Sequence, residues 1–428
     1  MSNDYLSSLP GEMLDEISKF FRHGDASHSA DIDVINEPEK SYRSLAQTCK
    51  SLRAHFQPCL FSNLYLRVDT RIRTFAELIQ DNPILASYVR IIGLEGHSMW
   101  GHFRYPPLLA IMRAASSFGT PPEIYLSIES LFNVDDEPGI NILSNTMTHI
   151  FNAPQTILHA ITELEIGCTE QVIPASLFAI LPNLCTLHGS HFVLSSDDCL
   201  AEDHTSQFFR PKLDALVLRS CSPATITMLC QQILDLSAVK ELEATYIETG
   251  NTTLNLNSRN FLAWRILECA QSVQKLRLDI QGMVGPFSDL SQFQHLRNCT
   301  LDLEVKVGTN PVLHLCQLLH TFPPLPEYVL EHLCLSFNLS YIPLDANDIL
   351  SSHVIFSIGA WSKFDNALVN VVSSGTRAFK LTLNFYIPTR NSLVKSSLKS
   401  LFVDWGRKHL PKSSQEPNLN IVIHHSCY

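Results

Sequence analysis

Apolar residues recur along most of the chain in short runs with the pattern apolar-x-x-apolar-x-apolar. Alternation over so few residues predicts short β-strands. The clear copies are Val89/Ile92/Leu94, Ile161/Leu164/Ile166, Leu213/Leu216/Leu218, Val273/Leu276/Leu278, Leu296/Cys299/Leu301, Leu330/Leu333/Leu335 and Ala378/Leu381/Leu383. Weaker copies are Leu126/Ile128, Leu184/Leu187, Val239/Leu242 and Leu419/Ile421/Ile423. The last of these predicts a final strand over 418–424 that pairs with a strand over 379–386.

Stretches with helical spacing of apolar residues lie between these runs, at residues 223–236, 258–271, 311–321, 354–371 and 392–409. A chain that repeats strand and helix in this way predicts parallel strands joined by crossover helices. The repeat length is irregular, since 23 residues separate Leu276 from Cys299 and 48 separate Leu333 from Leu381. We expect four distant leucines to be buried in one core: Leu216, Leu276, Leu333 and Leu381.

Polar residues occupy the positions between the apolar ones in these runs. Examples are Glu163/Glu165, Glu241/Glu243, Lys275/Arg277, Asn298/Asp302 and Lys380/Thr382. The strands of a doubly wound α/β fold are buried on both faces and form continuous apolar runs. The polar positions therefore predict that one face of this sheet contacts solvent, which favours an open array over a doubly wound fold.

The repeats resemble the leucine-rich-repeat family, although their spacing varies and the asparagine that often follows the strand is mostly missing. The resemblance implies an α/β fold, an irregular solenoid whose parallel strands form a concave wall suited to protein binding. The candidate substrate-binding residues on that wall are Glu241, Glu243, Lys275 and Arg277. Neighbouring strands would bring the two glutamates beside the two basic residues, so ion pairs that merely solvate the sheet are an equally good interpretation.

Two apolar stripes at the N-terminus predict two short helices. Pro10 suits a first helical position, and Met13, Leu14 and Ile17 follow at helical spacing. Residues 41–57 repeat the pattern, and Pro58 lies just beyond them. Two short helices cannot bury such stripes between themselves, so they are expected to dock on something else.

Three clusters in this region together resemble an F-box, the helical module that binds the adaptor of a cullin–RING ubiquitin ligase. They are Leu9-Pro10-Gly11-Glu12-Met13-Leu14-Asp15-Glu16-Ile17, Ser44-Leu45-Ala46-Gln47-Thr48-Cys49-Lys50-Ser51-Leu52 and Leu60-Phe61-Ser62-Asn63-Leu64. The resemblance implies an adaptor-binding surface made by Leu9, Pro10, Met13, Leu14, Ile17, Leu45, Cys49 and Leu52. The polar stretch 22–40 is longer than the family usually has between its helices. A helical cap on the following domain is the alternative interpretation.

The expected organisation is an F-box-like helical module at 1–66, a packed linker helix at 67–85 and the repeat array at 86–428. Ile72, Phe75, Leu78 and Ile79 have helical spacing, and Asn82-Pro83 follows. A packed linker would keep the two modules in a fixed orientation.

Composition removes several classes of function. The net charge of -11, without a Lys/Arg run, is unfavourable for nucleic acid or for an anionic membrane surface. No apolar stretch reaches the length of a membrane span, and the polar start of the chain predicts no signal peptide. We therefore expect a cytoplasmic or nuclear protein whose 12 cysteines are reduced.

Motifs for catalysis are missing from the sequence, which contains no nucleophile elbow, Walker loop or His-Glu-x-x-His pattern. The nearest approach to a metal site is Cys185, His188 and His191, and these are better explained as a core cysteine beside loop histidines. We expect no cofactor, no metal and no enzymatic activity.

The favoured hypothesis is a substrate receptor of an SCF-type ubiquitin ligase, which binds the adaptor through the F-box and an unknown target protein through the repeats. Such a chain supplies proximity for a reaction catalysed elsewhere. One alternative is a leucine-rich-repeat interaction scaffold that is not coupled to ubiquitination. A hydrolase or transferase on an α/β fold is a third hypothesis, which a polar pocket at the strand ends would favour.

Overall fold

The computed structural model describes two compact units. One consists of Met1–Gly167 with Ile180–Asn183, and the other of Cys168–Ala179 with Leu184–Tyr428. The described residues are 50–66, 69–96, 105–119, 121–129, 142–167, 172–195, 209–245, 269–280, 293–304, 312, 315, 316, 319, 330–338, 358–373, 378–387 and 408–427. We call the units unit 1 and unit 2. The division between them runs through the repeat region, and the expected three-part organisation stays a prediction.

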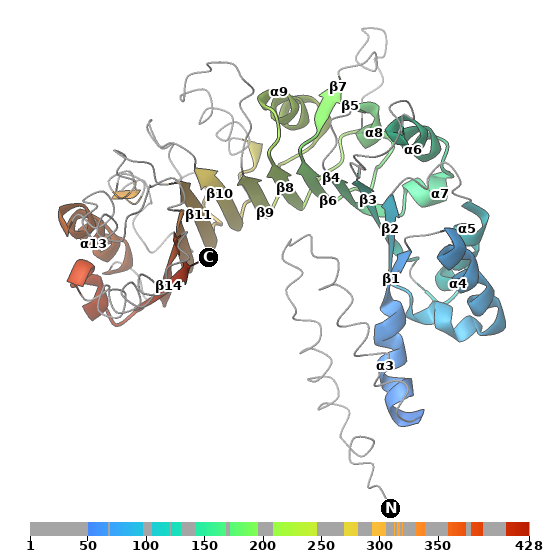
Figure 1. Cartoon of the computed structure of the whole chain (residues 1–428), viewed down its shortest axis with the longest axis horizontal. Helices are drawn as coiled ribbons and strands as arrows, with labels where there is room; N and C mark the ends of the chain where they lie inside the picture. Colours follow the sequence, from blue (N-terminus) through green and yellow to red (C-terminus); the bar gives the residue numbers. More distant parts are fainter. Residues whose placement is uncertain are drawn as a thin grey trace, which may run out of the picture. The chain divides into compact units, whose positions relative to one another are not determined.

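The fold is α/β, with a long all-parallel sheet that has twelve strands among the described residues. Four strands belong to unit 1 and eight to unit 2, and in each unit the strand order follows the chain. This architecture is compatible with a leucine-rich-repeat-like solenoid. In each unit the described helices lie on one face of the strands (Figure 1).

The described part of unit 1 begins with a helix that leads directly into a strand. Its described elements are α3 (Lys50–Ser62), β1 (Asn63–Leu66), α4 (Asp69–Asp81), the 3₁₀ helix η2 (Pro83–Tyr88), β2 (Ile91–Gly96), α5 (Tyr105–Ser116), β3 (Glu123–Glu129), α6 (Ile142–Phe151), α7 (Gln155–Leu158) and β4 (Ile161–Gly167). Leu66, Leu94, Leu126 and Leu164 are paired across the four strands and all are buried. This row of apolar side chains forms the core of the unit, under the helices.

Unit 2 continues the pattern with longer and shorter repeats. Its described elements are β5 (Val172–Pro174), α8 (Ser176–Ala179), β6 (Thr186–Ser190), β7 (Val193–Ser195), β8 (Ala215–Arg219), α9 (Pro223–Met228), the π-helical turn η4 (Leu229–Ile233), β9 (Glu241–Thr245), β10 (Lys275–Ile280), β11 (Asn298–Glu304), β12 (His332–Asn338), α13 (Ile358–Ser373), β13 (Phe379–Ile387), the 3₁₀ helix η6 (Ser413–Gln415) and β14 (Leu419–Cys427). β5 and β7 form a separate two-stranded parallel sheet.

The apolar positions of unit 2 pair in register from strand to strand. One row contains Leu187, Leu216, Leu242, Leu276, Cys299, Leu333, Leu381 and Ile421. Leu216, Leu276, Leu333 and Leu381 are each at most 2% exposed, as the sequence predicted. In-register stacking of this kind makes a continuous core from residues that are far apart in the chain.

Aromatic side chains close the core beneath α13. Trp361 and Phe364 on the helix, and Phe337 and Phe385 on β12 and β13, are completely buried. The rings of Phe337 and Phe385 are stacked with centroids 5.1 Å apart, and Trp361 packs edge-on to Phe337 at 5.8 Å. Rings in these arrangements contribute more than their buried area alone.

The strands predicted from the repeats are confirmed, including the C-terminal one. β14 pairs with β13 from Leu419 to Cys427, three residues further than expected. The predicted helices at 223–236 and 354–371 correspond to α9 with η4 and to α13, while most of 258–271 and 392–409 lies outside the described residues. The linker helix is present as α4, with Ile72, Phe75 and Ile79 buried and Leu78 41% exposed.

The predicted end of the helix at residue 57 was wrong, because α3 continues through Pro58 to Ser62. A proline inside a helix is costly, so tertiary contacts must compensate for it. Phe61 in the last turn of α3 lies against Phe75 of α4, with ring centroids 5.7 Å apart. The sequence also missed β1 and the pair β5–β7, which are too short to show a clear alternation.

Candidate functional site

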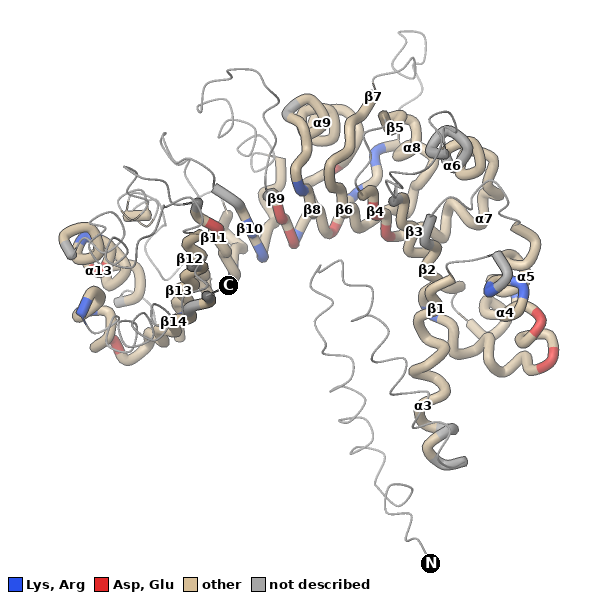
Figure 2. The backbone as a smooth tube through the Cα atoms, in the orientation of Figure 1, with Lys and Arg blue, Asp and Glu red and all other residues tan. Residues whose placement is uncertain are grey.

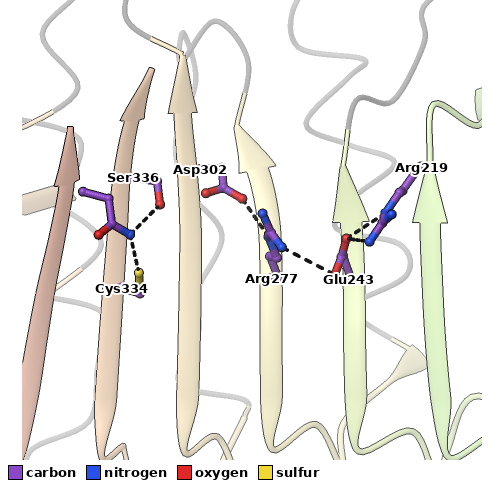
Figure 3. A network of polar contacts seen from close by, with 7 residues as sticks. Arg219, Glu243, Arg277, Asp302, Cys334 and Ser336 are labelled. Carbon is purple, nitrogen blue, oxygen red and sulfur yellow. Dashed lines mark hydrogen bonds and ion pairs between the residues drawn. The ribbon is translucent and has the colours of Figure 1, made fainter. Parts of the chain in front are cut away.

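The polar face of unit 2 carries a chain of ion pairs that crosses four strands. Arg219 on β8 lies 2.9 Å from Glu243 on β9, which in turn lies 3.9 Å from Arg277 on β10. Arg277 donates a hydrogen bond of 2.8 Å to Asp302 on β11. Figure 3 shows these four side chains in line along the sheet. We call them the unit 2 network.

The strand register explains why this network forms. Arg277 and Glu243 are direct partners across β10 and β9, and Asp302 is two residues beyond the position opposite Arg277. Such cross-strand neighbours are within reach of long side chains. Burial lowers the pKa of Arg277, but the hydrogen bond to Asp302 and the charges of Asp302 and Glu243 outweigh it and raise that pKa above its ordinary value. The network thus joins two arginines to two carboxylates, so its formal charges balance.

A second set of ion pairs lies near the beginnings of the strands. Lys275 lies 2.5 Å from Glu241, and Lys240 lies 2.9 Å from Asp214. All four side chains are more than half exposed, so these pairs contribute little to stability. Glu243, by contrast, has only 13% of its side chain exposed and bridges two arginines.

Uncharged polar groups continue the face on the last strands. Asn384 on β13 lies 3.2 Å from the Cys334 sulfur and 3.3 Å from the Ser336 hydroxyl, both on β12. His332 Nε2 and Thr382 Oγ1 are 2.8 Å apart. Burial lowers the pKa of His332, and the nearby charge of Lys380 lowers it further. Burial also raises the pKa of the Cys334 thiol, which keeps it protonated.

The polar face of unit 1 is built differently. The four strands β1 to β4 contain five glutamates and no Lys, Arg or His: Glu95, Glu123, Glu129, Glu163 and Glu165. In the part of unit 2 that the structure describes, the sign of the charge alternates from strand to strand: β9 and β11 carry acidic residues, and β10 between them carries Lys275 and Arg277 (Figure 2).

Two tyrosines lie in one register row of unit 1, with Gly93 between them. Tyr65 on β1 pairs with Gly93 on β2, which pairs with Tyr125 on β3. A Cβ atom at Gly93 would come within 2.6 Å of the Tyr65 ring, so the absence of a side chain at this position makes room for that ring. The rings of Tyr65 and Tyr125 meet edge-on at 6.4 Å, and the Tyr125 hydroxyl donates a hydrogen bond to Glu165 on β4. We call Tyr65, Gly93, Tyr125, Glu163 and Glu165 the tyrosine face.

Of the predicted substrate-binding residues, the structure brings Glu241 beside Lys275 and Glu243 beside Arg277. Sequence reasoning placed Asp302 on the polar face but did not select it as a binding residue, and it did not select Arg219 or the two tyrosines at all. Arg219, Asp302, Tyr65 and Tyr125 are each adjacent to a buried strand residue. The alternation of apolar and polar positions was therefore the signal that could have identified them as part of the polar face.

Most of the predicted adaptor-binding residues lie outside the described residues: Leu9, Pro10, Met13, Leu14, Ile17, Leu45 and Cys49. Leu52 is the exception, and it is 1% exposed on α3. Its side chain therefore packs within the chain.

The described residues offer few candidate positions for metal binding or for thiol chemistry. Among the described residues no group of three or more His, Cys, Asp and Glu side chains could hold a metal ion, and Cys185, His188 and His191 form no such group. A cavity of about 740 Å³ in unit 2 is lined by Phe209, Arg210, Cys230, Leu234, Asp235, Leu236, Ser237 and Cys269. Burial and the neighbouring Cys269 raise the pKa of Cys230 to about 12, so this thiol is protonated at neutral pH.

No protein-family model matches the chain, and no curated protein matches it. None of the described helices is long and apolar enough to cross a lipid bilayer. The structure is that of an α/β protein with a repeated parallel sheet and one polar sheet face.

Proposed function

We propose that the chain is a substrate receptor of an SCF-type cullin–RING ubiquitin ligase. The supporting observation is the ordered set of three F-box-like clusters within residues 9–64, followed by a parallel repeat sheet that offers polar side chains on one face. A repeat sheet provides a rigid frame for binding a protein partner. In this proposal the N-terminal helices bind the adaptor and the repeats bind the target.

The packing of α3 supports a receptor with a fixed geometry. α3 runs directly into β1 and contacts η2, and Phe61 packs on α4. In the proposal Leu52, which is buried, acts by holding α3 in place, and the contacts to the adaptor come from the apolar residues that precede it in the sequence. A rigid arm would hold the target at a set distance from the ubiquitin-loaded enzyme.

Capture of the purified adaptor by the full-length chain tests this proposal. Leu9→Ala with Pro10→Ala should abolish capture, because a few apolar anchors carry most of the energy of such an interface. The matched control is Leu78→Ala, which removes an exposed leucine from α4 and should leave capture unchanged. Capture that is equally strong with the double variant would reject the ligase function and favour the scaffold alternative.

A further inference from the structure

We infer that the polar face of β10 to β13, in the half where these strands begin, is the docking surface for an acidic segment of a partner protein. We call Lys275, Arg277, Thr300 and Lys380, which lie in that half, the basic patch. The inference rests on the proposed function in one respect, namely that the repeats bind a protein. It adds which part of the sheet binds and the chemistry of the partner.

The first argument is that the charged residues of β10 to β13 are separated along the length of the strands. The strand register places Lys275, Arg277 and Lys380 in the first two rows of polar positions. The acidic residues of these four strands all lie in later rows: Asp279, Asp302 and Glu304. The beginning of this face is therefore basic, although the whole chain has a net charge of -11.

The second argument is that Arg277 is more accessible than the carboxylates that it contacts. Its side chain is 49% exposed, whereas those of Glu243 and Asp302 are 13% and 23% exposed. The Nε atom of Arg277 donates to Asp302, and its Nη1 atom lies 3.9 Å from Glu243, which is longer than a hydrogen bond (Figure 3). A guanidinium group has several N–H donors, so Arg277 has donors left for a further carboxylate.

The third argument is that two other groups of the basic patch have no partner among the described residues. Lys380 on β13 is exposed and forms no ion pair there, and its direct neighbour in the register is His332. Thr300 on β11 is the register partner of Arg277, and within the described part of the chain its hydroxyl forms no hydrogen bond. A cation without a carboxylate and a hydroxyl without a partner both gain a contact when an acidic side chain binds.

The geometry of the sheet sets the spacing of the acidic side chains that fit. Adjacent strands are about 4.8 Å apart, so Lys380 on β13 lies roughly 14 Å from the strand that carries Arg277. An extended segment that crosses the strands advances about 3.3 Å per residue and directs alternate side chains to one side. Two acidic residues four positions apart are therefore separated by about 13 Å and match the distance from Arg277 to Lys380.

Binding of labelled synthetic peptides to the full-length chain tests the inference. The probe is a short Ser/Thr peptide with two Glu residues four positions apart, and the controls have the two Glu residues adjacent or replaced by Arg. We expect the spaced acidic peptide to bind about threefold more tightly than the adjacent one, since only the former contacts both cations at once. It should also bind more tightly than the basic peptide, which the net charge of the chain by itself would favour.

Charge removal distinguishes the basic patch from the other lysines of unit 2. Lys275→Gln with Lys380→Gln should weaken binding of the spaced acidic peptide about tenfold at low salt. The matched control is Lys363→Gln with Lys408→Gln, which removes two exposed lysines that lie outside the strands. The control should change binding less than about twofold. All four lysines are exposed, so the two double variants should melt at the same temperature.

A single substitution tests the contribution of the guanidinium group. Arg277→Lys keeps the positive charge beside Glu243 and Asp302 but loses the planar set of donors, so it should weaken peptide binding about threefold. Wild-type affinity of this variant would remove Arg277 from the docking surface and contradict the inference.

Three further results would overturn the inference. The first is an equal loss of binding in the two double variants. The second is a photoreactive acidic peptide whose cross-links fall outside β10 to β13, for example on the tyrosine face. The third is self-association that Lys275→Gln with Lys380→Gln abolishes, without any peptide binding, because the occupant would then be a second copy of the chain.

The outcome is independent of the ligase test. The basic patch belongs to unit 2 and lies outside residues 9–64, so its variants should capture the adaptor normally. Failure of capture by the wild-type chain together with specific binding of the acidic peptide would reject the ligase function and keep the docking surface. Normal capture without peptide binding would reject the docking surface alone.

Discussion

The polar faces of the two units differ in which charged side chains their strands carry. Both are formed by the alternate positions of short parallel strands over an in-register apolar core. Unit 2 neutralises its face with an internal network, in which Glu243 is held between Arg219 and Arg277. Unit 1 gathers carboxylates and two tyrosines without any basic residue on its strands. A repeated sheet therefore fixes where polar side chains lie but not how their charges are compensated.

The largest expected effect tests whether the two cores are alike. Leu276→Ala in unit 2 and Leu126→Ala in unit 1 should each destabilise the chain by about 2–5 kcal/mol, because both side chains are buried and truncation leaves a cavity. Denaturant unfolding followed by circular dichroism would measure the loss. A cost below about 1 kcal/mol for either variant would contradict a tightly packed core row in that unit.

Two glycine substitutions, one in each unit, compare how tightly the aromatic ring beside each glycine is packed. A Cβ at Gly189 would come within 2.3 Å of the Phe192 ring, which is 1% exposed and cannot move aside. Gly189→Ala should therefore cost about 1–3 kcal/mol through overpacking. Gly93→Ala meets the exposed Tyr65 ring, which can turn into solvent, so its cost in stability should be much smaller. Thermal melts of both variants would reveal the difference, and equal costs would place Tyr65 in a rigid environment.

Removal of one carboxylate from each face sharpens the electrostatic comparison. Glu243→Ala should destabilise the chain by about 1–3 kcal/mol, since it leaves two arginines facing each other across β9. Glu123 is exposed on β3 and, among the described residues, accepts a single long hydrogen bond of 3.4 Å from Thr162. Glu123→Ala should therefore change the free energy of unfolding by less than about 0.5 kcal/mol. Chemical denaturation at low and high salt measures both. Identical small costs would mean that the unit 2 network does not stabilise the fold.

The smallest expected effect is a pH dependence confined to unit 2. Burial and the charge of Lys380 depress the pKa of His332 in the folded chain. Below the ordinary value of about 6.5 the unfolded chain therefore binds more protons, and stability should fall as the pH drops from there towards the depressed folded value. His332→Gln can keep the contact to Thr382 and should flatten that part of the stability profile. An unchanged slope between about pH 7 and pH 5 would assign it to other groups.

The sequence by itself determined the parallel repeat and the side of each strand that is buried. Side chains alternate across a strand with a period of two, so the spacing of Leu276 and Leu278, or of Leu419 and Ile421, was sufficient to predict strand and core face. It also predicted that Glu241 and Glu243 meet Lys275 and Arg277, because neighbouring repeats of one pattern pair in register. The boundaries were less predictable, as Pro58 inside α3 shows.

Only the tertiary structure decided how the two faces differ. Arg219 and Asp302 join the network because twelve strands of unequal repeat length still align, which no local spacing specifies. Tyr65 lies over Gly93 because β1 pairs with β2, and a strand of four residues has too little alternation to predict that pairing. Local patterns are set by backbone geometry, whereas contacts between repeats depend on the register that packing of the whole core selects.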